Sequence, residues 1–91
     1  MTTMLSLYNE TGRRDACNVF TPSDLPTVAD VDEALDEGRE FWIEVNREDA
    51  EAEGLRVEDA YAAWRAGWRA QAVEMLTARD ARNRGGPDDE A

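Results

Sequence analysis

Carboxylates are the only side chains in this sequence that are numerous enough to suggest a chemical role. The 91 residues include 21 Asp or Glu, one cysteine and no histidine. Two carboxylates can catalyse glycoside hydrolysis when one has a raised pKa in an apolar pocket and faces the other across a cleft. A chain of this size, with its acids on the outer faces of its elements, is not expected to form such a cleft. The carboxylates therefore do not predict an enzyme.

Metal binding and nucleophilic catalysis find equally little support. The segment Asp30-Val31-Asp32-Glu33 begins like a calcium-binding EF-hand loop, but Gly38 comes too late to be the glycine of that loop. Without histidine, Cys17 has no imidazole to activate it, and we interpret it as a small buried apolar residue. The chain also lacks a P-loop, a GxGxxG motif and a CxxC pair. We predict no catalytic residue, no metal and no cofactor.

The acids are concentrated in one part of the chain. Residues 24–59 contain fourteen Asp or Glu against three Arg, whereas the other 55 residues contain seven of each, so this block carries the whole net charge of −11. Like-charged pairs four apart, such as Asp32/Asp36 and Glu33/Glu37, each destabilise a helix by about 0.2–0.5 kcal/mol. This segregation favours a surface that binds a basic protein, with a merely solvated face as the alternative. It argues against direct contact with nucleic acid or a membrane.

Ten residues of this block form the predicted partner-binding set. Trp42 is included because a tryptophan among carboxylates can receive an arginine by a cation–π contact if it is exposed; the alternative is that a helix covers it. The complete set is Asp30, Asp32, Glu33, Asp36, Glu37, Glu40, Trp42, Glu44, Glu48 and Asp49.

Local patterns predict the elements that position these residues. The N-terminal part suggests a hairpin of strands 4–8 and 16–20, joined by a turn at residues 9–12 and followed by a proline-containing loop over 21–26. Thr27 is predicted to cap an acidic helix that Gly38 ends. The alternation over 39–46 predicts a strand, and 47–53 a single helical turn ended by Gly54.

The last predicted element is a helix from about Val57 to Ala81. Its apolar residues recur at helical spacing, and we expect Tyr61, Trp64 and Trp68 to pack on the strand face of Phe41, Ile43 and Val45. Together these elements predict a small α+β domain over residues 1–84, with an antiparallel sheet, a short acidic helix and a long C-terminal amphipathic helix in the order β-β-α-β-α-α. The alternative is a mostly helical protein in which the strand that contains Phe41 is the only regular strand. Residues 85–91 are predicted to form a flexible acidic tail.

The segment from Asp59 to Gln71 resembles the Ala-rich helix with a central Gly-Trp that is common in small phage-encoded accessory proteins. The small size and strong acidity are similar to those of anti-CRISPR, anti-restriction and other DNA-mimic inhibitors. The resemblance implies an inhibitor that blocks a basic, nucleic-acid-binding host defence protein. A single cysteine and an N-terminus unlike a signal peptide favour the cytoplasm of a bacterial host.

The second functional hypothesis is a structural or assembly protein. In that case the helix carrying Trp64 and Trp68 would form the interface between copies of the chain. The sequence leaves a monomer and a homodimer open.

Overall fold

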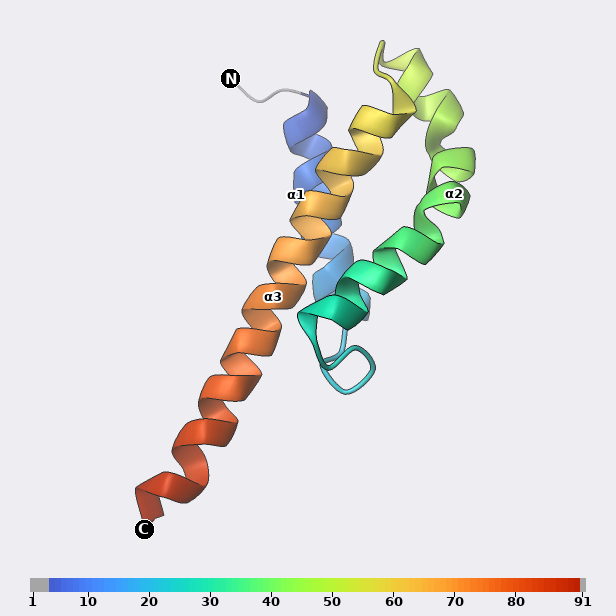
Figure 1. The fold of residues 1–91 in the computed structure, drawn as a ribbon. Helices are drawn as coiled ribbons and strands as arrows, with labels where there is room; N and C mark the ends of the chain where they lie inside the picture. Colours follow the sequence, from blue (N-terminus) through green and yellow to red (C-terminus); the bar gives the residue numbers. More distant parts are fainter. Residues whose placement is uncertain (1–3, 91) are drawn as a thin grey trace.

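The computed structural model describes the backbone of residues 4–90 and the side chains of residues 4–82. It contains three helices: α1 (Met4–Val19), α2 (Val28–Ala52) and α3 (Val57–Glu90). Helix α3 packs against both of the others, and α1 and α3 run in the same direction while α2 runs in the opposite one (Figure 1). No helix in the described residues is both long and apolar enough to cross a membrane.

The predicted α+β class is wrong, because residues 4–90 contain helices and no strand. The two segments predicted to form a hairpin lie in α1, with Phe20 directly after its end. The predicted turn at 9–12 is also helical: the Asn9 side chain donates a hydrogen bond to the carbonyl of Ala63 at 3.2 Å, and Gly12 is buried. Packing on α3 thus overrides the turn preference of these residues.

The predicted strand 39–46 and all of the helical turn 47–53 except Glu53, the C-cap residue, are part of α2. Alternation of Phe41, Ile43 and Val45 suggested a strand, but only Ile43 is buried, and the other two are 74% and 60% exposed. Glycine 38 does not end the helix. The left-handed glycine that does is Gly54, with φ of 78°, directly after the C-cap residue Glu53. The cap predicted at Thr27 is confirmed.

Helices α1 and α3 meet backbone to backbone at two glycines. A Cβ on Gly12 would overlap the carbonyl oxygen of Trp64, and a Cβ on Gly67 would overlap that of Asn9. Only glycine allows this approach. Beside it, Arg13 Nη1 lies 2.8 Å from Glu74 Oε2.

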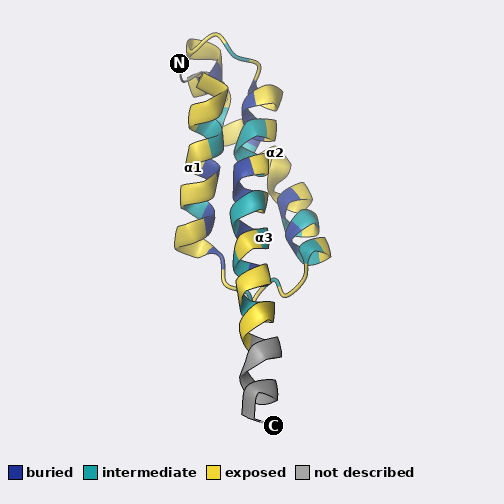
Figure 2. Ribbon diagram, turned by 90° about the vertical axis from the view of Figure 1, so that its left-hand side faces the viewer, coloured by how far each residue is buried: buried dark blue, intermediate teal, exposed yellow. Residues whose placement is uncertain are grey.

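The buried side chains form two clusters along α3. Figure 2 shows buried positions on all three helices. The first joins α1, α2 and the middle of α3 around Phe20, Leu35 and Trp68. The second joins α2 to the beginning of α3 around Ile43 and Tyr61. The apolar stripe predicted for the last helix is therefore correct, although its partners are helices. Cys17, predicted to be buried, is exposed.

Helix α3 begins at Val57 as predicted and continues to Glu90, past the expected end near Ala81. The predicted tail, residues 85–91, falls among residues whose side chains lie outside the described part of the chain. The division into a domain and a tail therefore stays a prediction.

Candidate protein-binding surface

Two acids of α2 form ion pairs with arginines of α3. Asp32 and Asp36 face α3, where Asp32 Oδ1 lies 2.7 Å from Arg69 Nε and Asp36 pairs with Arg65. The hydrogen bond from Arg69 lowers the pKa of Asp32, and the hydrogen bond to Asp36 raises the pKa of Arg65. These two predicted binding residues therefore attach α2 to α3.

Asp30 has a structural role at the start of the same helix. Its carboxylate accepts hydrogen bonds from the Thr27 hydroxyl at 2.8 Å and the Thr27 backbone N–H at 3.2 Å. In return, the Thr27 hydroxyl oxygen accepts a hydrogen bond from the Asp30 N–H at 3.1 Å. This reciprocal capping satisfies backbone donors that the first helical turn would otherwise leave unpaired.

Five predicted residues form an exposed line on the outer side of α2, which we call the acidic row. None of the five makes an ion pair or a side-chain hydrogen bond within the described part of the chain. Their spacing of three or four residues places them on one helix face, over about 22 Å from first to last at 1.5 Å per residue. The acidic row consists of Glu33, Glu37, Glu40, Glu44 and Glu48.

Two arginines border the acidic row without pairing with it. Arg39 and Arg47 lie near Glu40 and Glu44 in a surface depression, but no N–O distance there falls within the 4 Å of an ion pair. The Arg39 guanidinium instead lies 5.9 Å from the centre of the Tyr61 ring. Among the described side chains, no arginine therefore makes an ion pair with the row.

Trp42 is half-buried within an aromatic cluster that joins all three helices. Its ring centre lies 6.0 Å from that of Tyr8 on α1, and 5.4 and 5.6 Å from those of Tyr61 and Trp64 on α3. Of the two alternatives for Trp42, the structure therefore favours the one in which a helix covers it over the one in which it is exposed among acids. Its cluster fills part of the space between α1 and α2.

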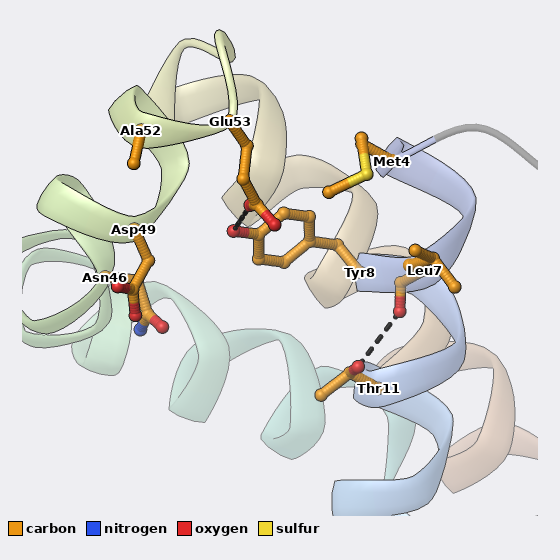
Figure 3. Close-up of a pocket in the computed structure, with 8 residues that line it drawn as sticks. All are labelled: Met4, Leu7, Tyr8, Thr11, Asn46, Asp49, Ala52 and Glu53. Atoms are coloured by element: carbon orange, nitrogen blue, oxygen red, sulfur yellow. Dashed lines mark hydrogen bonds between the residues drawn. The ribbon is translucent and has the colours of Figure 1, made fainter.

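The remaining predicted residue, Asp49, lies in a depression between the beginning of α1 and the end of α2 (Figure 3). There the Tyr8 hydroxyl donates a 2.6 Å hydrogen bond to Glu53 Oε1. Burial, this hydrogen bond and the charges of Glu53 and Asp49 raise the pKa of Tyr8 to about 12. Met4 and Leu7, both partly exposed, line the same depression.

Sequence reasoning missed the two exposed apolar residues beside the acidic row, Phe41 and Val45. Both were assigned to the core because they alternate with polar residues. Phe41 follows Glu37 by four residues and precedes Glu44 by three, and Val45 follows Phe41 by four. This helical spacing was the signal that could have placed Phe41 and Val45 beside the acids on the outer face.

Phe41 also lines an apolar cavity of about 370 Å³ between α2 and α3. Trp42, Tyr61, Trp64 and Trp68 provide further aromatic walls. Trp68 is only 8% exposed and forms the deep side, whereas the strongly exposed Phe41 stands at the rim. The surface of α2 therefore combines a row of carboxylates with an adjoining apolar hollow.

No three acids or cysteines among the described side chains come together as a cation site would require. Comparison of the chain with protein-family models, curated proteins and solved structures found no match. A function for the chain is therefore inferred from the chemistry of the α2 surface.

Proposed function

We propose that this chain is an acidic inhibitor that occupies a basic nucleic-acid-binding surface of a larger protein through the outer face of α2. The observation that carries the proposal is the contrast between two sets of acids on one helix. Asp32 and Asp36 are paired with arginines of α3, whereas the acidic row has no partner within the described residues. Such a row offers contacts to cationic side chains of another protein.

The spacing of the carboxylates in the row can be compared with the spacing of phosphates in DNA. Five carboxylates over about 22 Å lie roughly 5–6 Å apart along the helix axis. Phosphates follow each other every ~3.4 Å along one DNA strand and every ~1.7 Å when both strands are counted. The row thus reaches somewhat more than half the density of a single strand. It suits a basic track that contacts one strand better than a channel that encloses a duplex.

The alternative of an assembly protein has no comparable support. Trp68 packs edge-on against Phe20 with ring centres 5.6 Å apart, and the Trp64 indole N–H donates a 2.9 Å hydrogen bond to Asp15. Both side chains already have partners within the chain. The narrower expectation of a host defence target depends only on the sequence resemblance and stays a prediction.

Capture from a bacterial lysate tests the proposal. The row variant carries Glu37→Gln, Glu40→Gln and Glu44→Gln, and its matched control carries Glu10→Gln, Asp59→Asn and Glu74→Gln, which remove the same charge from α1 and α3. Wild type and the control should retain a nucleic-acid-binding protein that duplex DNA elutes. Retention should fall between about 0.1 and 0.5 M salt as the Debye length shortens. The row variant should retain little of it. Equal retention by all three would contradict the proposal.

A further inference from the structure

The side of α2 next to the acidic row is unusually open for a helix packed on two others. Ala34, Gly38 and Phe41 line the apolar cavity, and a Cβ built on Gly38 would meet no atom within 4 Å. The two small residues therefore leave the aromatic walls accessible from outside. Phe41 remains 74% exposed at the rim because nothing in the described chain covers it.

The surroundings of Phe41 indicate which kind of molecule would cover it. Glu37 precedes it by four residues, Glu40 by one, and Glu44 follows by three, so carboxylates border the rim along α2. A second copy of this chain would bring a further net charge of −11 to the same place. Electrostatic repulsion thus disfavours self-association there, whereas a cationic segment is attracted.

An amphipathic helix combines the two properties that this surface selects. Its apolar face presents side chains at i, i+3, i+4 and i+7, and lysines or arginines can follow along the same axis. We propose that the cavity beside Phe41 receives a leucine or aromatic side chain from a cationic amphipathic helix of the basic partner, while flanking cations contact Glu37, Glu40 and Glu44. This inference rests on the proposed function and names the chemistry of its partner.

Anchoring in the cavity would give the interface a specificity that charge alone lacks. Central aromatic or aliphatic anchors in desolvated pockets dominate many protein interfaces, and charged rims mainly affect the rate of association. Trp42, Trp64 and Trp68 all line the cavity, so an inserted side chain should change the tryptophan fluorescence of this protein. The response separates insertion from loose electrostatic binding.

The test uses two synthetic helical peptides of about 18 residues, five turns long. One carries lysines with leucines at i, i+3, i+4 and i+7; the other has glutamine in place of every leucine and the same charge. We expect the Leu/Lys peptide to shift the tryptophan emission and to bind wild type at least tenfold more tightly than the Gln/Lys peptide. Equal affinity for the two peptides would overturn the inference.

Substitutions at Gly38 and Phe41 locate the binding. Gly38→Leu should fill the opening of the cavity and weaken the Leu/Lys peptide about tenfold, because the peptide's leucine can no longer be buried. Gly38→Ala, which adds a single carbon at the same exposed position, should stay within about twofold of wild type. Phe41→Ala should weaken the Leu/Lys peptide, and Val19→Ala, at an exposed apolar residue of α1, should not.

The row variant separates failure of this inference from failure of the proposed function. If it loses both peptides while Gly38→Leu and Phe41→Ala bind like wild type, the charge proposal stands and the cavity is no anchor site. If it keeps both peptides, the proposed role of the row fails. A dimer of wild type that Gly38→Leu dissociates in sedimentation would assign the cavity to a second copy and overturn the inference.

Discussion

Gly67 and Gly12 are the residues at which the backbone of α1 approaches that of α3 most closely. A Cβ on Gly67 would overlap the carbonyl oxygen of Asn9, a backbone atom that cannot move without shifting α1. We expect Gly67→Ala to lower the free energy of unfolding by about 1–3 kcal/mol, as overpacked cores do. Urea denaturation followed by circular dichroism measures this change.

The matched control is Gly38→Ala. A Cβ on Gly38 meets open space, so the substitution should raise the free energy of unfolding by about 0.5–1 kcal/mol through helix propensity alone. If Gly67→Ala were as stable as Gly38→Ala, the close contact between the backbones of α1 and α3 at Gly67 would be contradicted.

Tyr8 makes the stability depend on pH in the alkaline range. Burial, followed by the hydrogen bond to Glu53, raises its pKa to about 12 in the folded protein, against about 10 in the unfolded chain. The folded state therefore favours the protonated phenol. This contribution is complete below pH 10 and is lost as the pH rises toward 12. Tyr8→Phe should be less stable than wild type at pH 8, and the difference should shrink from pH 10 to 12 in urea titrations.

A Tyr8→Phe variant whose deficit stayed constant across that range would show that the phenol does not titrate as described. Tyr61 remains in both proteins and contributes to both curves, since burial raises its pKa as well. Only the difference between the two curves reports on Tyr8.

At the scale of elements, ion pairs with α3 hold the N-terminal half of α2. The hydrogen bond from Arg69 is the main cause of the lowered pKa of Asp32. A depressed folded-state pKa stabilises the protein above the unfolded value near 4 and loses its effect as the pH falls through the folded value. Arg69→Gln should therefore be less stable than wild type by about 0.2–1 kcal/mol at pH 7, as expected for exposed pairs.

Thermal unfolding at pH 7 and at pH 2.5 checks this account of Arg69. The difference between wild type and Arg69→Gln should be smaller at the lower pH, because the contribution of the pair declines as the pH falls from the unfolded value of Asp32 toward its lowered folded-state pKa. A difference of the same size at both pH values would assign the loss to packing of the arginine stem instead.

The acidic row should reduce the stability of α2, because its like charges repel one another. Substituting Glu37, Glu40 and Glu44 by glutamine removes five like-charged pairs at spacings of three or four, four within the acidic row and one with Asp36, each worth about 0.2–0.5 kcal/mol. The row variant should thus be more stable than wild type by about 1–2 kcal/mol in urea at low salt, and the gain should diminish in about 1 M salt. A less stable row variant would mean that these acids have structural partners.

The helical spacing along α3 was sufficient to predict its start and its buried stripe, because Tyr61, Trp64 and Trp68 define one face without outside information. The cap at Thr27 was equally local. In α2, by contrast, Phe41, Ile43 and Val45 alternate by chance over a short stretch, and only packing against α3 selects Ile43 for burial.

The candidate surface was predictable only as a set of acids. The separation of Asp32 and Asp36 from the acidic row depends on Arg69 and Arg65, which lie 37 and 29 residues away in the sequence and adjoin α2 only after folding. No local pattern contains that pairing. Likewise, the sequence around Gly12 indicates a turn, and only the contact with the backbone of Trp64 explains why a glycine lies within a helix there.

Over the whole molecule the net charge is −11, and five of the carboxylates line the outer side of α2. Arginines of α3 neutralise part of the inner side of α2 and leave its outer side negative. A field of this kind steers cationic partners and opposes self-association. In sedimentation velocity at about 0.15 M salt, where the Debye length is about 8 Å, we therefore expect a monomer. A stable dimer would favour assembly over inhibition.

Competition with nucleic acid measures directly whether the acidic row occupies a nucleic-acid site. A labelled DNA duplex is bound to the protein captured from the lysate, and the chain is added in increasing amounts. Wild type and the control variant should displace the DNA, and the row variant should need at least about tenfold more protein, a loss of about 1.4 kcal/mol. Displacement by the row variant at the wild-type concentration, or binding of wild type without loss of DNA, would contradict the claim that the acidic row occupies the nucleic-acid site.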